Sequence, residues 1–405
     1  MITIWLYLVA ELSALQQVVN LLTGLNGLPA VIVECFVTTV YTAAGGFRVS
    51  FVTDNVQGAM VIALIIVGVI TVGVETNVQR DLIPESRYLD ASLLGWQLIY
   101  ILPVAILTND FFLSGFWMRT FAAKTDKDLW VGISIAVVVI TLILTLVGVG
   151  GLLAGWSGVL GNPPTPTGTE LFQLFETLPA WVVGIVLVMV VALSTAAFDS
   201  LQSSIISTGS NDLFRNKLNI WIIRAITVVI FVPTVVVALK SPSVLQIYLI
   251  SDLISASSIP VLVIGLSSRC YWWRGFEVVV GGLGGILTIF LFGLVYYDGD
   301  ASKAGALLIL EEGLYVNDWS AFGAFVAAPV GGLLWAAAAF ALRISVQWML
   351  AKRTGRRFDA FDKPEAPDAS FYTGRHYDNV DRNDGPHRDE DGVERSVTEV
   401  KGKFF

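Results

Sequence analysis

Long apolar runs are the feature that most constrains the fold of this 405-residue chain. A helix that crosses a bilayer needs about 20 mostly apolar residues, because its backbone groups must find their hydrogen bonds within the segment. Ten segments meet this requirement: residues 2–22, 27–46, 54–75, 92–116, 130–155, 178–212, 218–239, 243–265, 275–297 and 320–345. The sequence therefore predicts an all-α polytopic membrane protein with about ten transmembrane helices.

Composition excludes several classes of protein. With 55% hydrophobic and 14% charged residues, the chain has too little polar surface for a soluble globular protein. Its net charge of −8 includes no basic stripe, so nucleic acid is not an expected partner. Cys35 and Cys270 give no disulfide framework or metal-ligand spacing, and both histidines, His376 and His387, lie in the polar C-terminal region. The sequence shows no phosphate-binding loop or catalytic triad, so we expect neither an enzyme nor a cofactor.

Basic residues predict the orientation in the membrane. Lysine and arginine concentrate in alternate loops, as Arg119, Lys124 and Lys127 illustrate, and the opposite loops are poorer in them. We therefore expect both termini in the cytoplasm and the protein in the plasma membrane. Residues 1–345 form the predicted transmembrane domain. Residues 346–405 form a predicted cytoplasmic tail, largely disordered because it has few apolar residues to bury.

Two short motifs connect the second and third apolar segments. Residues 41–48 read Tyr-Thr-Ala-Ala-Gly-Gly-Phe-Arg, and residues 53–57 read Thr-Asp-Asn-Val-Gln. The glycine pair allows a tight turn with positive φ. Asp54 suits the first turn of the following helix, where the helix dipole favours a carboxylate.

Both motifs resemble the helix–loop–helix signature of the sodium:solute symporter family, although Val49 stands where a small residue is usual. The charged stretch 119–128 resembles a loop of the same family, and residues 192–213 resemble one of its helices. The resemblance implies a second role for Asp54, in which it lines the inner exit path of a coupling cation, Na⁺ or H⁺.

In sodium-coupled members, two hydroxyl side chains on the matching helix ligate sodium, and Ser194 and Thr195 resemble that pair. Aligning the following Asp-Ser pair without a gap instead places Ala196 and Ala197 at the hydroxyl positions. Two residues turn a helix by about 200°, and a methyl group cannot ligate a hard cation. Either a local bulge restores the hydroxyls or the chain lacks this sodium site, and we favour the second.

Asp199 then becomes a candidate proton carrier, with Ser200 beside it, because an ionisable residue inside a span is functional by default. The alternative is a carboxylate neutralised by Arg224 of the next segment or hydrogen-bonded to Ser203. The predicted cation or proton pathway consists of Asp54, Ser194, Thr195, Asp199 and Ser200.

A substrate pathway is predicted where polar residues interrupt the apolar pattern. The fourth segment contains Pro103 and the polar pair Asn109-Asp110. Broken helices expose backbone groups to substrate in transporters, so we assign Asn109, Asp110 and Asp252 to this pathway. The serine-rich run 251–258 either lines the pathway or serves helix packing. The other charged residues inside spans, expected to be packing partners, are Glu11, Glu34 and Arg224.

The family resemblance also implies a fold, an incomplete leucine-transporter-like core of two inverted repeats. By motif position, residues 2–265 resemble the third to tenth core helices, and the helices between 275 and 345 are peripheral. The first two core helices are then lacking. We therefore expect an N-terminally truncated transporter, or a partner that fills the gap.

The expected function is cation-coupled symport of a small polar solute across a lipid bilayer, with fungal urea and polyamine carriers as the most similar group. The alternative is a truncated, non-transporting fragment or a membrane sensor that retains the symporter scaffold. The substrate, the choice between sodium and proton, and the oligomeric state stay open at this point.

Overall fold

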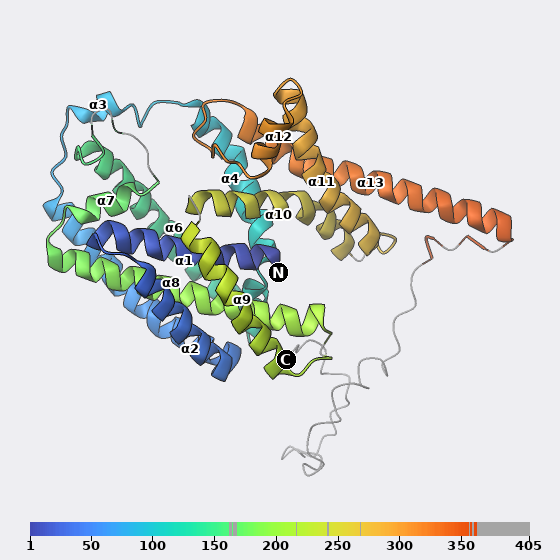
Figure 1. Cartoon of the computed structure of the whole chain (residues 1–405), viewed down its shortest axis with the longest axis horizontal. Helices are drawn as coiled ribbons and strands as arrows, with labels where there is room; N and C mark the ends of the chain where they lie inside the picture. The colour runs from blue at the N-terminus through green and yellow to red at the C-terminus, as the bar shows by residue number, and fades with distance from the viewer. Residues whose placement is uncertain are drawn as a thin grey trace, which may run out of the picture.

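We describe the protein from a computed structural model, which covers residues 1–161, 164, 168–215, 217–240, 243–267, 269–355, 357–358 and 360–362, without the side chains of residues 43–52, 220 and 227. In chain order the elements are α1 (Ile2–Thr23), α2 (Leu28–Glu75), α3 (Leu82–Ser86), α4 (Leu93–Phe112), α5 (Ser114–Ala122), α6 (Asp126–Trp156), α7 (Glu170–Glu176), α8 (Ala180–Thr208), the π-helical turn η1 (Gly209–Leu213), α9 (Ile220–Lys240), α10 (Val244–Leu266), α11 (Gly275–Tyr296), α12 (Ala301–Leu308) and α13 (Ser320–Thr354). All regular elements of the described part are helical, which confirms the predicted fold class (Figure 1). Most of the predicted tail lies outside the described residues.

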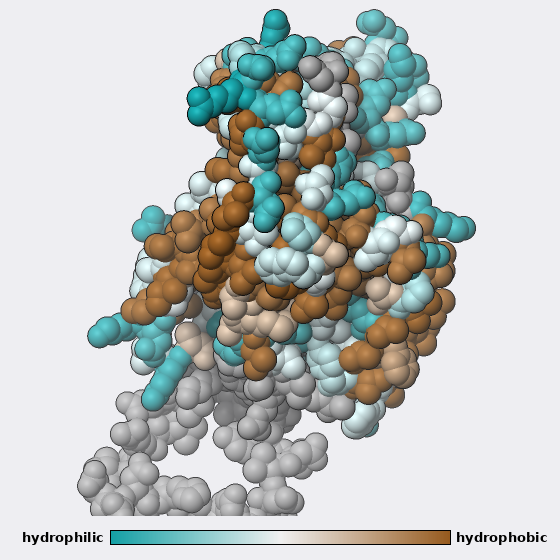
Figure 2. Space-filling model, turned by 90° about the vertical axis from the view of Figure 1, so that its left-hand side faces the viewer, coloured by the Kyte–Doolittle hydropathy of each residue, from teal (hydrophilic) through white to brown (hydrophobic). Residues whose placement is uncertain are grey.

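Nine helices of the described part are long and apolar enough to cross a membrane. The predicted segment 27–46 corresponds to a shorter apolar helix, Leu28–Thr42. Figure 2 shows hydrophobic side chains, in brown, over the middle of one face and hydrophilic ones, in teal, gathered at its top. Apolar surface of this extent suits contact with lipid, so the chain is an integral, multi-pass membrane protein.

α2 doubles back on itself beside α8. Tyr41 Oη and Thr53 Oγ1 both donate to one oxygen, Asp199 Oδ2, over 2.7 and 3.1 Å. A straight helix would separate residues 41 and 53 by about 18 Å, so the chain reverses direction between them. Figure 1 shows the two arms side by side in darker and lighter blue. We call residues 28–42 the first arm and residues 53–75 the second arm; they match the two predicted segments.

The fourth predicted segment, residues 92–116, forms two helices instead of one. α4 ends at Phe112 and α5 begins at Ser114. Between them Leu113 has φ −77° and ψ 96°, which is an extended conformation. The break lies just after the polar pair in α4, so the interrupted apolar pattern marks its position well.

The charged stretch 119–128 is a loop only in part. Arg119 lies in the last turn of α5, and Asp126 is the first residue of α6. Thr125 caps α6, because its Oγ1 accepts a hydrogen bond from the backbone N–H of Asp128 over 3.1 Å. This cap satisfies an N–H group at the helix start and explains why α6 begins before the predicted residue 130.

α10, α11 and α13 pack with their backbones close together. A Cβ atom on Gly285 of α11 would lie 2.8 Å from the carbonyl oxygen of Ala328 in α13. A Cβ atom on Gly332 of α13 would lie 2.3 Å from the carbonyl oxygen of Ser257 in α10. Small residues at such crossings allow close van der Waals packing between membrane helices, so α11 and α13 are firmly attached to α10.

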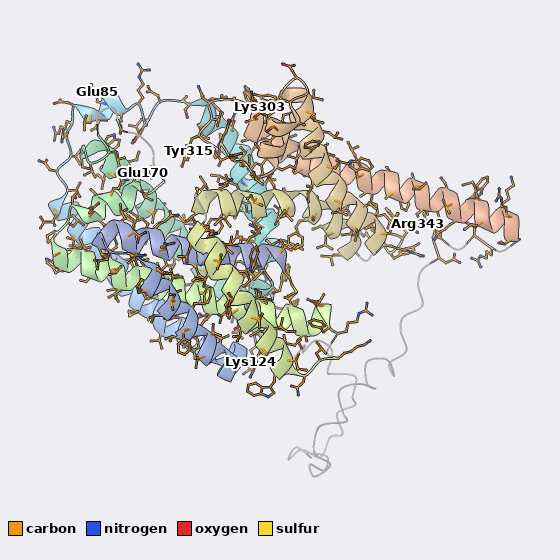
Figure 3. The ribbon with its side chains drawn as sticks, viewed as in Figure 1. Glu85, Lys124, Glu170, Lys303, Tyr315 and Arg343 are labelled. Carbon is orange, nitrogen blue, oxygen red and sulfur yellow. The ribbon has the colours of Figure 1, made fainter. Side chains whose placement is uncertain are left out.

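A buried ion pair also joins α11 to α13. Arg343 Nε donates to Glu277 Oε1, and Arg343 Nη2 donates to the carbonyl of Trp272 over 2.7 Å. The Glu277 side chain is fully buried and the Arg343 side chain is 10% exposed. α13 continues to Thr354, beyond the predicted end at residue 345, and Figure 3 shows Arg343 where α13 passes the start of α11.

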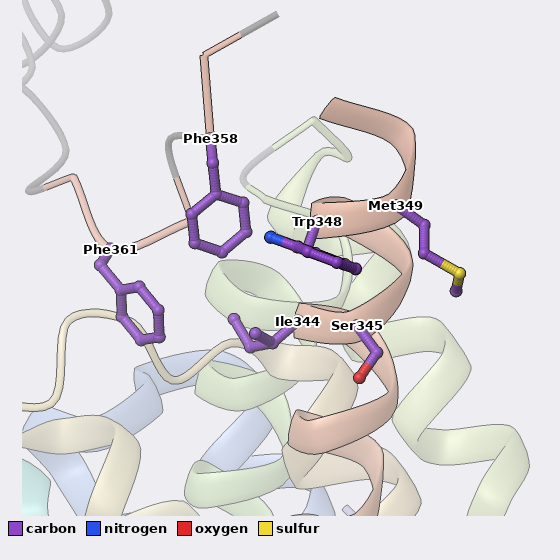
Figure 4. A pocket seen from close by; sticks show the side chains of 6 residues that line it. All are labelled: Ile344, Ser345, Trp348, Met349, Phe358 and Phe361. Carbon is purple, nitrogen blue, oxygen red and sulfur yellow. The ribbon is translucent and has the colours of Figure 1, made fainter. Parts of the chain in front are cut away.

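A shallow apolar pocket lies at the C-terminal end of α13 (Figure 4). Its lining consists of Ile344, Ser345, Trp348, Met349, Phe358 and Phe361. Tyr271 Oη donates to the carbonyl of Phe361 over 3.0 Å and holds one side of the pocket in place. The pocket has no charged lining residue and contains none of the predicted site residues, so we look elsewhere for the functional site.

Arg343→Met tests the ion pair. The variant leaves the Glu277 carboxylate buried without a cation, which typically costs about 3–5 kcal/mol. We expect a clear fall in the unfolding temperature of the detergent-purified protein, measured by size-exclusion chromatography after heating. Arg357→Met is the control. The side chains of Arg357 and its partner Asp362 are 82% and 52% exposed, and an exposed ion pair contributes about 0–1 kcal/mol to stability. Equal unfolding temperatures for the two variants would contradict the structural role of the buried pair.

Candidate functional site

Polar side chains collect in two places within the apolar helices. The first, which we call the carboxylate–tyrosine cluster, consists of Tyr7 and Glu11 of α1, Asn109 and Asp110 of α4, and Tyr248 and Asp252 of α10. The second, which we call the α2–α8 seam, consists of Glu34, Tyr41, Thr53 and Asp54 of α2, Ser194, Asp199 and Ser200 of α8, and Arg119 of α5. Together they contain every predicted site residue except Thr195.

Asn109 is the centre of the carboxylate–tyrosine cluster. Its side chain is fully buried, and its Nδ2 donates to Tyr7 Oη over 2.7 Å and to Asp252 Oδ1. Its Oδ1 accepts from Ser255 Oγ over 3.2 Å and from Ser251 Oγ over 3.4 Å. One amide therefore ties α4 to α1 and α10, and the serine-rich run of α10 serves partly to hold this amide in place.

Two tyrosines and a glutamate lie next to this amide. Tyr248 Oη donates to Glu11 Oε1 over 3.0 Å. The rings of Tyr7 and Tyr248 meet edge to face, with centroids 4.9 Å apart and an interplanar angle of 82°. Carboxylates and aromatic rings both attract organic cations, so this pairing suits a positively charged ligand.

In the part of the chain that the structure describes, the acids of the cluster are not paired with lysine or arginine. Asp110 is exposed, and its charge acts on Asp252. The three ion pairs of the described residues use Asp54, Glu277 and Asp362 instead. Three acids contributed by three helices, without a basic partner, give the cluster the chemistry of a cation-binding site.

The predicted substrate-pathway residues lie together in this cluster. Asn109 and Asp252 are in direct contact, and Asp110 lies on the exposed side of them. Sequence reasoning missed Tyr7 and Tyr248, because tyrosines in apolar helices are usually core residues, and it treated Glu11 as a packing partner. The available signal was spacing, since residues 7 and 11 share one face of a helix.

Asp54 and Arg119 form one end of the α2–α8 seam. Arg119 Nη2 donates to Asp54 Oδ2 and, over 2.7 Å, to Ser200 Oγ. Ser200 Oγ also lies 3.4 Å from Asp54 Oδ2. The side chains of Arg119 and Asp54 are 34% and 21% exposed, so this end is open to solvent. The carboxylate of Asp54 binds across to α5 and α8, which goes beyond capping its own helix.

Asp199 is fully buried in the middle of the seam. Its Oδ2 accepts hydrogen bonds from the hydroxyls of Tyr41 and Thr53. Its Oδ1 accepts a hydrogen bond from Ser200 Oγ over 3.3 Å. The two partners suggested by the sequence are wrong: Ser203 Oγ has no hydrogen-bond partner, and Arg224 lies over the ring of Trp221, 4.8 Å from its centroid. Asp199 is therefore held by hydroxyl groups from both arms of α2.

Ser194 and Thr195 do not share a site. Ser194 Oγ donates to Glu34 Oε1 over 2.9 Å, whereas Thr195 Oγ1 donates to the carbonyl of Val191 over 2.7 Å. Thr195 also lines an apolar groove between the second arm of α2 and α8. α8 is a regular α-helix from Ala180 to Thr208, so these residues contain no bulge that would bring the two hydroxyls together.

Buried oxygen atoms without a hydrogen-bond partner concentrate along α2 and α8. Of seven such buried side-chain atoms in the described residues, five lie there: Glu34 Oε2, Thr42 Oγ1, Asp54 Oδ1, Gln57 Oε1 and Ser203 Oγ. Each unsatisfied atom costs about 1–3 kcal/mol. No three His, Cys, Asp or Glu side chains of the described part converge as metal ligands. Most of the unsatisfied buried atoms of the described part therefore lie on the two helices that form the seam.

Asn109→Ala tests the centre of the carboxylate–tyrosine cluster. The variant removes hydrogen bonds to Tyr7 and Asp252 and should lower the free energy of unfolding by about 1–3 kcal/mol. We expect a lower unfolding temperature in detergent. Thr108→Val is the matched control, because the Thr108 hydroxyl bonds only to carbonyls of its own helix. Equal stability of the two variants would show that the amide is not a structural link.

No protein-family model matches the chain. A curated relative, the spermidine transporter DUR31 of Candida albicans (strain SC5314 / ATCC MYA-2876), is 51% identical over 366 residues. The alignment covers 90% of this chain and 70% of the relative. Identity at this level over most of the helical part shows common descent and a shared fold.

Proposed function

Because this chain belongs to the family of the spermidine transporter DUR31, we propose that it carries spermidine or a similar polyamine and that a proton gradient drives the transport. The broader statement needs no proposal: the chain is a membrane transporter of a small polar solute. The relative's activity as a transporter also points away from an enzyme. The resemblance of the motifs to the sodium:solute symporter family, together with its inverted-repeat core, stays a prediction.

The carboxylate–tyrosine cluster is the observation that carries the choice of a polyamine. A polyamine presents several ammonium groups separated by short methylene chains. Glu11, Asp110 and Asp252 lie on α1, α4 and α10, so they offer separate acceptors for charge-assisted hydrogen bonds. The rings of Tyr7 and Tyr248 offer faces for cation–π contacts and apolar surface for the methylene groups.

Urea is the alternative substrate that the sequence suggested. It is neutral and needs paired hydrogen-bond donors and acceptors, but no negative charge. Three acids that form no ion pair within the described residues would then gain nothing from the substrate, and the amide of Asn109 is already bonded to Tyr7 and Asp252. The chemistry of the cluster therefore favours the polyamine.

The α2–α8 seam is the proposed path of the coupling cation. It links buried Asp199 to the partly exposed pair of Asp54 and Arg119, and Ser200 lies between them. The hydroxyls of Ser194 and Thr195 bond to different partners, so they do not form a joint sodium site. This separation supports a proton as the coupling ion.

The charge distribution supports the predicted orientation. Figure 3 shows Lys124 and Arg343 away from the end of the molecule that holds Glu85 and Glu170. By the positive-inside rule, we place the end with Lys124 in the cytoplasm, together with both termini. In a plasma membrane, the acidic end would then face the outside, where substrate arrives.

Uptake of labelled spermidine into vesicles that contain the full chain tests the function. We expect saturable uptake, with little uptake of labelled urea. Asp252→Asn removes one charge from the cluster and should raise KM about tenfold, which corresponds to about 1.4 kcal/mol. Asp298→Asn, an exposed acid outside the cluster, should leave KM unchanged. Urea uptake that exceeds spermidine uptake, or an unaltered KM in Asp252→Asn, would refute the assignment.

Separate sodium and pH gradients across the same vesicles test the coupling ion. We expect spermidine accumulation to respond to the pH gradient and not to the sodium gradient. Asp199→Asn should abolish the response to pH while spermidine exchange at equilibrium persists, because the amide cannot carry the proton. Ser203→Ala, a neighbour on α8 whose hydroxyl has no partner, is the control. Sodium-driven uptake that Thr195→Ala removes would instead establish a sodium site, and an unaltered pH response in Asp199→Asn would exclude this carboxylate.

A further inference from the structure

We propose that the C-terminal end of α13 binds an anionic phospholipid of the membrane leaflet at this end of the protein. The surface, which we call the α13 lipid site, consists of the apolar pocket of Figure 4 and the basic residues Lys352, Arg353 and Arg357. This lipid site is independent of the transported solute and of the coupling ion, so it goes beyond the proposed function.

α13 continues past the helix that supports it. Arg343 bonds to Glu277 and to the carbonyl of Trp272, which attaches α13 to the start of α11. The helix then runs on to Thr354, and Figure 1 shows these last turns extending beyond the rest of the bundle. Four apolar residues of this extension are 40–54% exposed: Val346, Trp348, Met349 and Leu350. Exposed apolar surface of this kind marks an interaction site, and in an integral membrane protein lipid is at hand to cover it.

Aromatic side chains gather around this end of α13. The rings of Trp272 and Trp273 contact Phe340 of α13, with centroids 4.8 and 6.0 Å away. Phe361 meets the same ring at 6.4 Å and Phe358 at 5.9 Å. Tryptophan and tyrosine are enriched where a membrane meets water. The two tryptophans therefore place this level of the protein at the membrane surface.

One face of α13 changes from apolar to basic toward its end. Residues four positions apart share a face of a helix. Ile344 and Trp348 line the pocket, and Lys352 follows on their face, with Nζ 5.2 Å from the centroid of the Trp348 ring. Met349 lines the pocket as well and is followed by Arg353 in the same way. A phospholipid presents the same order, first its acyl chain and then its phosphate.

The chain turns back after α13 and forms the other wall of the pocket. Gly355 ends the helix with φ 67°, the left-handed conformation that suits glycine. Phe358 and Phe361 follow it and line the pocket together with Trp348 of α13 (Figure 4). Both walls are largely apolar, so the pocket suits the part of an acyl chain that lies next to the headgroup.

The basic residues are available to a headgroup. The three ion pairs of the described residues use neither Lys352 nor Arg353. Arg357 pairs with Asp362, but an ion pair as exposed as this one is weak. Lysine and arginine form charge-assisted hydrogen bonds with phosphate oxygens. The choline cation of a neutral phospholipid would be repelled by the same charges, which favours an anionic headgroup.

The proposed orientation agrees with this choice of ligand. It places the basic end of the protein in the cytoplasm, and the cytoplasmic leaflet is the one that carries anionic lipids. A soluble acidic peptide would also bind the basic residues, but it would leave the apolar residues of the extension in water. The combination of charge and apolar surface therefore points to a lipid.

Native mass spectrometry of the detergent-purified full chain tests the site, with phosphatidylserine and phosphatidylcholine of identical acyl chains as probes. We expect the wild type to retain phosphatidylserine in preference to phosphatidylcholine. The double variant Lys352→Gln/Arg353→Gln should retain about 25-fold less phosphatidylserine, since each basic residue near an anionic surface contributes a factor of about five. Lys124→Gln/Lys127→Gln is the matched control, because it removes two exposed charges elsewhere and should behave as the wild type.

Two further measurements separate a lipid from a soluble anion. Phosphatidylserine should raise the unfolding temperature of the wild type, because a ligand that binds the folded state stabilises it. It should raise that of Lys352→Gln/Arg353→Gln much less. Trp348→Ala should also retain less phosphatidylserine, since it removes part of the apolar wall. Unaltered retention in Trp348→Ala would show that the charges alone bind the lipid and would overturn the site as proposed.

Three other results would overturn the proposal. Equal retention of both lipids by the wild type would show that the headgroup is not recognised. An equal loss in the Lys124→Gln/Lys127→Gln control would show that net charge, and not this site, determines retention. The absence of any phosphatidylserine adduct on the wild type would show that lipid is not the occupant, as expected if an acidic peptide or the chain beyond Asp362 covers the surface. Failure of spermidine uptake would refute the proposed function and leave the lipid site untouched.

Discussion

The buried carboxylate of Asp199 is the interaction on which the arrangement of the proposed proton path depends. A buried charge is costly, and hydroxyl donors from three positions reduce that cost. Tyr41 and Thr53 approach one oxygen from opposite arms of α2, and Ser200 approaches the other. These contacts join both arms of α2 to α8.

The sequence predicts the helices well because membrane crossing imposes a minimum apolar length, which is a property of the local sequence. It also marks the break near Leu113, since polar interruptions act locally. The predicted positions of the helix ends were less accurate. A threonine cap started α6 early, and α13 continued to Thr354 because basic residues are compatible with the last turns of a helix.

The candidate sites were only partly predictable, for a different reason. A charged residue inside an apolar segment is visible in the sequence, but its partner is set by tertiary packing. Glu11 and Glu34 look alike as isolated acids in apolar runs. Only the structure shows that Glu11 meets the hydroxyl of Tyr248 and that Glu34 meets Ser194. Tyr248 could not be singled out, because its partner Glu11 lies 237 residues away in the sequence.

The pairing of the buried acids divides them by role. Glu277 has an arginine partner and lies where α11 and α13 are packed together, so its charge serves stability. Within the described residues, Asp252 and Glu34 form no ion pair with a basic residue, although burying an acid in this way is unfavourable for folding. Such a cost is compatible with the proposed function, in which a bound organic cation supplies the missing positive charge at Asp252.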